Sequence, residues 1–176
     1  MSELTGSHRI AAGLDLRGRS YEGGQMSFCS VLDSGLSGTE VRGGRLTGNG
    51  WIHCNFCCGS YSGMLLEMER FDRCAVGNVR LTRVEAIELR ASECSFAGDR
   101  WSGCTFEKGK FRKCTFSHIS MEDVLFVGTV FEDCTFLDTS MKNVRFRKVK
   151  FKNCRFGAQP GELCERCRFV RCEILG

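Results

Sequence analysis

Cysteine is the residue of this chain with the most obvious potential for chemistry, since there are 13 cysteines among 176 residues. Thiolates bind zinc, and a thiol beside one of the three histidines would be an activated nucleophile. Two segments have the Cys-x-x-Cys spacing of zinc sites, from Cys54 to Cys57 and from Cys164 to Cys167, and Cys172 follows the second. Zinc binding and thiol chemistry are therefore the first hypotheses.

The spacing of the other cysteines indicates a structural repeat. One series recurs at intervals of twenty residues: Cys54, Cys74, Cys94, Cys114, Cys134 and Cys154. A metal site gathers its ligands in one place, whereas a long and regular period is typical of solenoids, in which each repeat is one turn of a coil. The elements that carry the cysteines therefore have to be established before their chemistry.

A hydrophobic residue recurs at every fifth position from Leu16 to Phe156. All 29 positions of this series are hydrophobic, although only 42% of the residues in the chain are. If residues were placed independently, such a series would arise with a probability on the order of 10⁻¹¹. The period matches neither the helix, with 3.6 residues per turn, nor the flat strand, in which side chains alternate.

Two further columns accompany this central position. Two residues before it lies a small or β-branched residue, which is often cysteine. Two residues after it, the 29 positions from Gly13 to Asn153 hold ten glycines and seven asparagines or aspartates, which tolerate tight or left-handed turns. Each unit of five residues therefore directs one large and one small side chain inward and ends in a turn.

In this pattern the chain resembles the pentapeptide-repeat proteins. The motifs Cys114-Thr115-Phe116-Ser117-His118 and Cys134-Thr135-Phe136-Leu137-Asp138 show the family's order of a small residue, a polar residue, a central Phe or Leu and two variable residues. The resemblance covers roughly residues 12–156 and departs from the family in preferring Cys to Ala and Phe to Leu. It implies an all-β fold, a right-handed quadrilateral parallel β-helix with four units in each rung.

The length of the repeat predicts about seven rungs, which would form a rod of about 34 Å at a strand spacing of about 4.8 Å. We expect an N-terminal cap at residues 1–12, the β-helix at residues 13–156, and a loop with a capping partial rung at residues 157–176. The phase breaks after Phe156 at a segment that contains Gly and Pro, and the pattern resumes near Phe169. Such a rung would cover the open end of the core.

In this fold the cysteines are predicted to be packing residues. Ten of the 13 fall in the small inward column, where a free thiol acts as a compact hydrophobic group. Cys57 and Cys58 lie outside that column, as does Cys164. The sequence also lacks a nucleophile–base–acid set and a phosphate-binding glycine motif. We therefore predict no metal site, no cofactor and no enzymatic activity; zinc is left as an alternative for Cys164, Cys167 and Cys172.

The function of such a rod is expected to lie in the outward residues of its faces. Face A is centred on one column of the repeat: Met26, Leu46, Leu66, Ala86, Phe106, Phe126 and Phe146. Six apolar residues in outward positions of this face are predicted to bind a protein partner: Phe28, Leu65, Met68, Ile87, Leu125 and Val127. A contiguous exposed apolar patch marks an interface, and the alternative is that these side chains shield the sheet or are covered by a terminus.

Face B is basic, and it is centred on another column: Phe71, Ala91, Phe111, Phe131 and Phe151. From Lys142 to Arg155 there are seven basic residues and no acidic one. Five of them form a candidate anion-binding site across faces A and B: Arg145, Arg147, Lys148, Lys150 and Lys152. Counterion release would favour a polyanion there, but mixed charges also keep a sheet soluble. With a net charge of only +4, nucleic acid is not the expected partner.

Together these features favour a non-enzymatic protein-binding module that serves as a scaffold or accessory subunit of a larger bacterial complex. A homodimer or an end-to-end contact between copies is a further expectation. The resemblance implies two alternatives, a DNA-mimic-like binder of a type II topoisomerase such as gyrase and a secreted effector. The mild basic charge and the unbroken phase between residues 16 and 156 argue against gyrase protection.

The cellular compartment is predicted from the cysteines and from the first residues. The number of cysteines is odd, and the N-terminal residues do not resemble a signal peptide, so we expect reduced thiols and a cytoplasmic protein. The apolar runs are too short for a membrane span.

Overall fold

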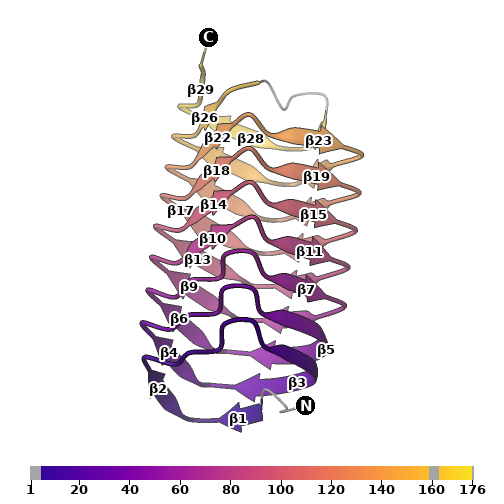
Figure 1. The fold of residues 1–176 in the computed structure, drawn as a ribbon. Coiled ribbons are helices and arrows are strands. Elements are labelled where there is room, and N and C mark those ends of the chain that lie inside the picture. Colours follow the sequence, from indigo (N-terminus) through magenta and orange to yellow (C-terminus); the bar gives the residue numbers. More distant parts are fainter. Residues whose placement is uncertain (1–4, 159–162, 176) are drawn as a thin grey trace.

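The computed structural model describes residues 5–158 and 163–175, which form a right-handed quadrilateral β-helix (Figure 1). The chain winds in about eight turns, close to the seven that the sequence predicts. All strand pairs are parallel, because the chain returns to each face in the same direction. The described residues contain no helix with the length and apolar character that crossing a membrane requires.

The four faces follow one another along the chain in the order A, B, C, D. Face A consists of β1 (Thr5–Ser7), the second halves of β3 (Ser20–Ser27) and β5 (Glu40–Thr47), β8 (Leu65–Glu67), β12 (Glu85–Ile87), β16 (Thr105–Glu107), β20 (Leu125–Val127), β24 (Arg145–Arg147) and β27 (Cys164–Glu165). Face B consists of β2 (Ile10–Ala12), β4 (Ser30–Leu32), β6 (Gly50–Ile52), β9 (Arg70–Asp72), β13 (Arg90–Ser92), β17 (Lys110–Arg112), β21 (Val130–Glu132), β25 (Lys150–Lys152) and β28 (Arg168–Val170).

Faces C and D complete each turn. Face C begins with isolated bridges that join Asp15, Gly35, Asn55 and Ala75, and continues as β10 (Ala75–Gly77), β14 (Ser95–Ala97), β18 (Thr115–Ser117), β22 (Thr135–Leu137), β26 (Arg155–Phe156) and β29 (Glu173–Ile174). Face D consists of the first halves of β3 and β5, followed by β7 (Ser60–Ser62), β11 (Arg80–Thr82), β15 (Arg100–Ser102), β19 (Ser120–Glu122) and β23 (Ser140–Lys142).

Residues twenty positions apart lie side by side on neighbouring turns. Phe116 of β18 is in register with Phe96 of β14 and with Phe136 of β22. Backbone amides donate to carbonyl groups of the adjacent turn, as Thr135 N does to Cys114 O at 3.0 Å. The columns predicted from the sequence are therefore physical stacks, and the prediction of a β-helix is confirmed.

The turn position, two residues after each central residue, has a left-handed backbone. From His8 to Asn153 every fifth residue has a positive φ, between 47° and 71°. Gly, Asn and Asp occupy many of these positions, as the sequence predicts, but large side chains such as Phe28, Met68 and Lys113 adopt the same conformation. A left-handed backbone costs a residue other than glycine roughly 1 kcal/mol, so the stacked turns must impose it.

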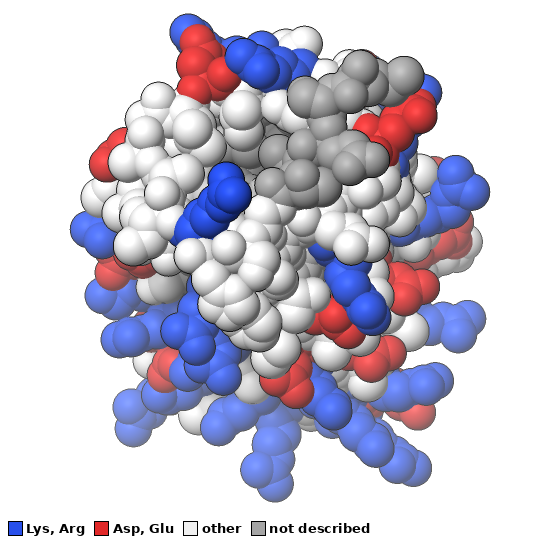
Figure 2. Space-filling model, turned by 90° about the horizontal axis from the view of Figure 1, so that it is seen from below, with Lys and Arg blue, Asp and Glu red and all other residues white. Residues whose placement is uncertain are grey.

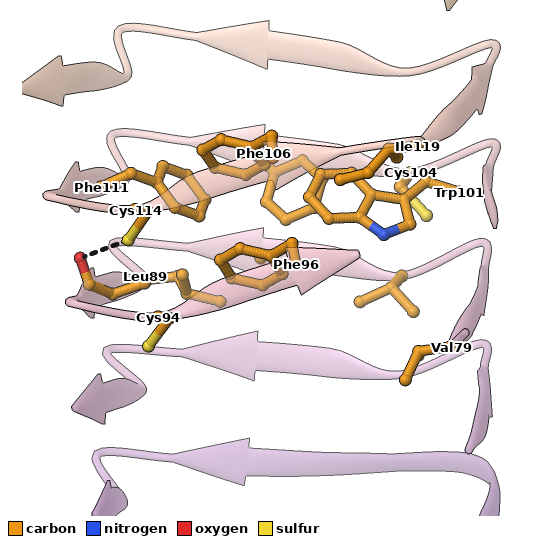
Figure 3. Close-up of a cluster of buried hydrophobic side chains, with 14 of the residues drawn as sticks. Val79, Leu89, Cys94, Phe96, Trp101, Cys104, Phe106, Phe111, Cys114 and Ile119 are labelled. Atoms are coloured by element: carbon orange, nitrogen blue, oxygen red, sulfur yellow. Dashed lines mark hydrogen bonds between the residues drawn. The ribbon is translucent and has the colours of Figure 1, made fainter. Parts of the chain in front are cut away.

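Aromatic rings fill the core of the C-terminal half. Figure 3 shows Phe96, Trp101, Phe106 and Phe111 pointing into the core from the four walls of one turn. Rings within a turn meet edge to face, and Phe106 and Phe111 have centroids 6.2 Å apart at an angle of 68°. Rings in a column stack face to face, and the centroid of Phe96 lies 5.0 Å from that of Phe116 at an angle of 3°. Both geometries are favourable for aromatic pairs.

The core of the N-terminal half is less completely filled. Two central positions are occupied by Ala86 and Ala91, which are buried but too short to reach the axis of the coil. A wholly apolar cavity of about 110 Å³ is lined by residues from Leu16 to Phe111. Packing in this half is therefore incomplete where the aromatic columns are interrupted.

The coil begins earlier than the sequence predicts. Residues 5–12, which were expected to form a separate cap, build β1 and β2 and are in register with β3 and β4. Gly6 and Ala11 occupy the central positions of this first turn, and side chains this small do not mark a core in the sequence. The rest of the expected cap, residues 1–4, lies outside the described residues.

The last turn is shorter than the others. Phe151 pairs with Phe169 and Phe156 pairs with Ile174, a separation of 18 residues in place of 20. Residues 159–162 of the expected loop lie outside the described residues. The partial rung stacks on the core, but Phe169 and Ile174 are themselves exposed.

Candidate functional site

The ten cysteines of the inward column are packing residues. Eight of them are at most 4% exposed, and Cys167 and Cys172 near the C-terminal end are half-buried. Their thiols donate to backbone carbonyl groups, as Cys114 does to Ala91 O at 3.5 Å (Figure 3) and to Arg112 O at 3.4 Å. Each thiol thus adds a weak hydrogen bond to its apolar contacts, which accounts for cysteine in a column that needs only a small residue.

The two Cys-x-x-Cys pairs point in different directions. Cys54 is buried, whereas Cys57 is an outward residue of the same turn and Cys58 occupies the left-handed position with a φ of 58°. Cys164 takes the central position of β27. Burial, followed by a hydrogen bond with Cys167, raises the pKa of the Cys164 thiol to about 12 and disfavours the thiolate. Within residues 5–158 and 163–175, no cluster of three His, Cys, Asp or Glu side chains is placed to hold a metal ion.

The histidines lie at turn positions of different corners. His53 Nδ1 is 3.4 Å from Asp33 Oδ1, and His118 Nε2 is 3.4 Å from Asp138 Oδ2. His8 belongs to the first turn, at the corner that follows face A. Both His–Asp contacts join exposed side chains of neighbouring turns and contain no nucleophile, so they orient surface residues and do not form a catalytic set.

Four of the six predicted partner-binding residues lie on face A, and none of them is paired directly with another on a neighbouring turn. Leu65 and Leu125 occupy one outward column, but a Glu and a Thr of the two intervening turns separate them. Ile87 and Val127 occupy the other outward column, with Glu107 between them. All four side chains are partly exposed. Face A therefore presents separated apolar side chains among polar ones.

The other two residues, Phe28 and Met68, lie at the corner between faces A and B. Their side chains are 53% and 47% exposed, more than any other large apolar residue between the two ends of the coil. The Phe28 ring stacks on His8, with centroids 5.3 Å apart and an angle of 24°. It also covers Gly48 on the next turn, where a Cβ atom would lie 2.7 Å from the ring.

Beside this corner, face B carries an apolar stripe that was missing from the predicted site. Ala12, Leu32 and Ile52 are outward residues in direct register on β2, β4 and β6, and the stripe ends at Asp72. The other outward column of these three strands contains an Ile, a Ser and a Gly. We call the surface formed by Phe28, Leu32, Ile52 and Met68 the N-terminal corner. Sorting outward residues by turn as well as by face would have found it.

Charge is distributed unevenly around this region. Figure 2, which looks at the N-terminal end of the coil, shows an end surface with few charged side chains, while Lys and Arg side chains project from the sides. On face B the outward charges begin at Arg70 of β9. The N-terminal corner is therefore an uncharged surface bordered by basic and acidic residues, an arrangement that suits an interface core with a polar rim.

Two carboxyl groups are buried in the small inward column, that of Glu69 in the N-terminal half and that of Asp99 in the turn that contains Phe96 and Trp101. Glu69 Oε1 accepts hydrogen bonds from Asn49 N at 3.0 Å and Nδ2 at 2.9 Å, and Oε2 accepts one from Trp51 Nε1 at 2.7 Å. Asp99 Oδ1 accepts one from Val79 N at 2.8 Å, whereas Oδ2 has no partner in the described part of the chain. Burial raises the pKa of each carboxyl to about 7. Their contacts are with turn amides and core side chains, which is a structural role.

The candidate anion-binding residues on β24 and β25 are partly neutralised by acids from neighbouring turns. Arg147 Nε lies 3.1 Å from Glu165 Oε2, and Lys152 Nζ lies 2.5 Å from Glu132 Oε1. The other three have no ion-pair partner among the described residues: Arg145, Lys148 and Lys150. The five residues therefore lie around the corner of faces A and B, and two of their five positive charges are paired with a carboxylate.

Comparisons with known proteins agree with this fold. A family model described as a pentapeptide repeat region matches residues 92–176. The fold is similar to that of QnrB1, a plasmid-mediated fluoroquinolone resistance protein, of which a trypsin-treated form aligns with a TM-score of 0.57 and 13% identity over 99% of this chain and 91% of that one. The pentapeptide repeat protein Rfr23 from the cyanobacterium Cyanothece 51142 aligns with a TM-score of 0.36 and 10% identity over 82% of this chain and 88% of that one. No curated protein matches the sequence.

The matched region covers the later turns, and the same columns of central, small and turn residues continue toward the first turn. The likeness to QnrB1 concerns the fold alone, because the identity is 13%. The repeat, the coil and the family model agree: residues 92–176 match the pentapeptide-repeat family, and the chain has the β-solenoid fold of pentapeptide-repeat proteins.

Proposed function

We propose that this protein is a non-enzymatic binding module, a rigid β-helical rod that docks onto a protein partner as a scaffold or accessory subunit of a larger bacterial complex. The observation that carries the proposal is the N-terminal corner, where Phe28 and Met68 remain about half exposed and the adjoining face B carries the uncharged outward residues Leu32 and Ile52. Apolar side chains gathered on a flat surface gain free energy when a partner removes them from water.

The backbone at this corner supports a binding role. Phe28 and Met68 have φ angles of 52° and 54°, and Gly48 fills the equivalent position on the turn between them. Glycine would avoid a cost of roughly 1 kcal/mol at each of these two positions. Because the two side chains are half exposed, their burial within the coil offsets this cost only in part.

A partner for this surface would present a flat apolar patch surrounded by polar groups. Leu65 extends the contact onto face A, whereas Leu125 and Val127 lie three turns farther along, among polar columns. The Leu65 end of face A is therefore the part of the originally predicted surface that we include in the site. The free thiols of the ten inward cysteines favour a partner in the cytoplasm.

The exposed end of the last turn supports contact between two copies of the chain. Phe169 stacks on Phe151, with centroids 5.0 Å apart, and is still 45% exposed. Further exposed apolar side chains lie in the same turn: Val170, Ile174 and Leu175. Sedimentation velocity over a range of concentrations tests this contact, since Phe169→Ser should shift a self-associating rod toward the monomer.

The gyrase-binding alternative draws on the likeness to QnrB1, which is described as a fluoroquinolone resistance protein. A DNA mimic needs a continuous acidic surface, but Arg70, Arg90 and Lys110 stack in one outward column of face B and the net charge is +4. These charges favour the scaffold. A supercoiling assay with purified gyrase separates the two, because the scaffold should have no effect at micromolar concentration. A secreted effector would present the same corner to a host protein.

The test of the proposed function is affinity purification from the native host with the rod and its variants as baits. Replacing both corner residues, Phe28→Gly and Met68→Gly, should abolish capture of the specific partner while leaving the melting temperature unchanged or higher, because glycine relieves the left-handed backbone. Lys113→Gly is the matched control, since Lys113 has a φ of 51° at a turn position of another corner. Equal recovery of the partner with the double variant would exclude the N-terminal corner.

A further inference from the structure

Face D carries two arginines whose charges are not balanced by the protein. Arg80 of β11 and Arg100 of β15 are in direct register on adjacent turns, so their backbones lie about 4.8 Å apart. Neither side chain has an ion-pair partner within the described ranges. Like charges placed side by side on a sheet repel each other. The protein therefore keeps an unfavourable pair that an anion would relieve.

The two arginines border a hollow at the corner between faces C and D. It has a volume of about 200 Å³ and is lined by Asn78, Val79, Arg80, Gly98 and Arg100. The hollow exists because Gly98 has no side chain, since a Cβ atom there would lie 2.6 Å from Asn78 Oδ1. The oxygen of the Asn78 carboxamide is therefore the atom nearest to Gly98. Two arginines and a neutral carboxamide thus line one concave site.

The surroundings of the hollow supply hydroxyl groups. In the column of the two arginines, Ser60 lies on the turn before and Ser120 on the turn after. Asp99 is adjacent in sequence but its carboxyl points inward and accepts a hydrogen bond from Val79 N at 2.8 Å. The next surface carboxylate on face D, Glu122, pairs with Lys142.

We propose that this hollow, which we call the arginine hollow, binds a phosphate-type oxyanion between the guanidinium groups of Arg80 and Arg100. Guanidinium groups present paired N–H donors that match the oxygens of phosphate, and a dianion bound between them replaces their repulsion with two attractions. The column ends in serine on both sides. The arginine hollow therefore suits a compact phosphate group, whereas a nucleic-acid backbone needs a longer track of positive charge.

Face B provides a natural comparison. Arg70 and Arg90 are also in register on adjacent turns, and the next residue of their column, Lys110, lies 3.4 Å from Glu132, a carboxylate that it shares with Lys152. Neither arginine lines the hollow described above. The positive charge is similar in the two places, while the concave shape belongs to the corner of faces C and D. A variant of Arg90 therefore controls for charge alone.

The experiment is a titration of the full chain with inorganic phosphate, followed by the chemical shifts of the arginine Nε–H groups, with acetate as the comparison anion. We expect saturable phosphate binding that shifts the signals of Arg80 and Arg100, and acetate binding that is roughly tenfold weaker. Arg80→Gln and Arg100→Gln should each weaken phosphate binding by about tenfold or more, while Arg90→Gln should change it less than about twofold.

A second variant tests the site without removing the charge of either arginine. Asn78→Asp keeps the shape of the side chain and tolerates the φ of 55° at this turn, but it places a carboxylate in the arginine hollow. Phosphate binding should be lost while thermal melting shows a folded coil. The proposal is overturned if phosphate binding is absent, if Asn78→Asp leaves it unchanged, or if Arg90→Gln weakens it as much as Arg80→Gln does.

The source of the phosphate group is distinguished in the same assay. Phosphoserine in a short peptide is titrated beside inorganic phosphate, and tighter binding of the peptide would assign the arginine hollow to a phosphorylated partner. Single-stranded DNA is the third titrant. If DNA binds more tightly than both and Arg90→Gln weakens it equally, the charge of the whole rod is responsible and the compact site is excluded.

Discussion

The two halves of the coil have the same backbone and are filled in different ways. In the C-terminal half, phenylalanine columns stack with centroid distances such as 4.7 Å between Phe116 and Phe136. In the N-terminal half, the corresponding pair Trp51 and Phe71 is 6.3 Å apart, and a cavity of about 110 Å³ lies along the core. A repeat of five residues therefore specifies where side chains point, while the fit between them is set turn by turn.

The halves also differ in where they place polar groups. In the N-terminal half, Asn49 and Glu69 occupy the small inward column, and the outward residues of face B are uncharged up to β9. In the C-terminal half, Cys fills much of that column, with Asp99 at its start, and the outward residues of face B are densely charged. The half that we propose as the docking end thus has fewer charges on face B than the well-packed half.

The largest expected effect compares one phenylalanine from each half. Phe116 is 0% exposed and stacked on both sides, so Phe116→Ala should lower the free energy of unfolding by about 3–5 kcal/mol. Phe71 is only partly buried, lines the cavity and has Ala91 on its other side, so Phe71→Ala should cost about half as much. Urea unfolding measures both. Equal losses would mean that the two halves are equally well packed.

The pH dependence of stability tests the two buried acids of the inward column. The pKa values of Glu69 and Asp99 rise to about 7 in the folded chain from ordinary values of 4.5 and 3.8. The folded protein therefore holds more protons than the unfolded chain between these values. Stability should be greatest below about pH 4.5 for these groups and should fall as the pH rises through 7, by roughly 3 kcal/mol for each.

Unfolding curves between pH 5 and pH 8 check this expectation, and Asp99→Asn is the matched variant. Asparagine keeps the acceptor for Val79 N but cannot ionise, so part of the pH dependence should disappear. The hydrogen bond from Lys152 lowers the pKa of Glu132, which moves the titration of that exposed carboxylate away from this range. Stability that increases from pH 5 to pH 8 would contradict the assignment.

Two glycines of the inward column should respond differently to substitution by alanine, with smaller changes in stability. At Gly59 a Cβ atom would lie 2.7 Å from Tyr61 Cε2, because the tyrosine ring fills the space beside the glycine. Gly59→Ala should therefore destabilise the protein by roughly 1–3 kcal/mol. At Gly109 the nearest atoms would be 3.4 Å away or more, so Gly109→Ala should be neutral or stabilise by up to about 1 kcal/mol. Thermal melting of the two variants shows whether each substitution raises or lowers the stability.

The smallest expected effect is a gain from filling the cavity. Ala91 has Phe71 and Phe111 as its neighbours in the column, and both line the cavity. Ala91→Leu should raise the free energy of unfolding by about 0.5–2 kcal/mol, because the added atoms occupy empty apolar space. A loss of stability in a urea titration would show that the surrounding side chains cannot accommodate leucine.

The sequence was sufficient to predict the coil because its period is carried by side chains that must be buried. Phe96, Phe116 and Phe136 are central residues both in the repeat and in the structure. The same argument identified the thiols as packing groups, and the thiol of Cys114 is buried as expected. The start of the coil was missed, because Gly6 has no side chain with which to mark the core.

The candidate sites could be predicted only in part, because outward residues obey no such constraint. Periodicity placed Phe28 and Leu125 on one face but did not show that Glu85 and Thr105 lie between Leu65 and Leu125. The pair of Arg80 and Arg100 required a comparison of positions twenty residues apart on face D, and the hollow beside it depends on the missing side chain of Gly98. Composition and spacing do not predict local shape of this kind.

The column of thiols has a consequence for how the coil comes apart. From Cys54 to Cys172, seven successive turns each place one sulfur in the same inward position of face C, and all but Cys172 are buried. In a solenoid each turn contacts only its neighbours, so the ends can fray while the middle stays intact. An alkylating reagent would then label first the cysteines of the turns that open most readily. The chain therefore contains one built-in probe of local unfolding in each of these turns.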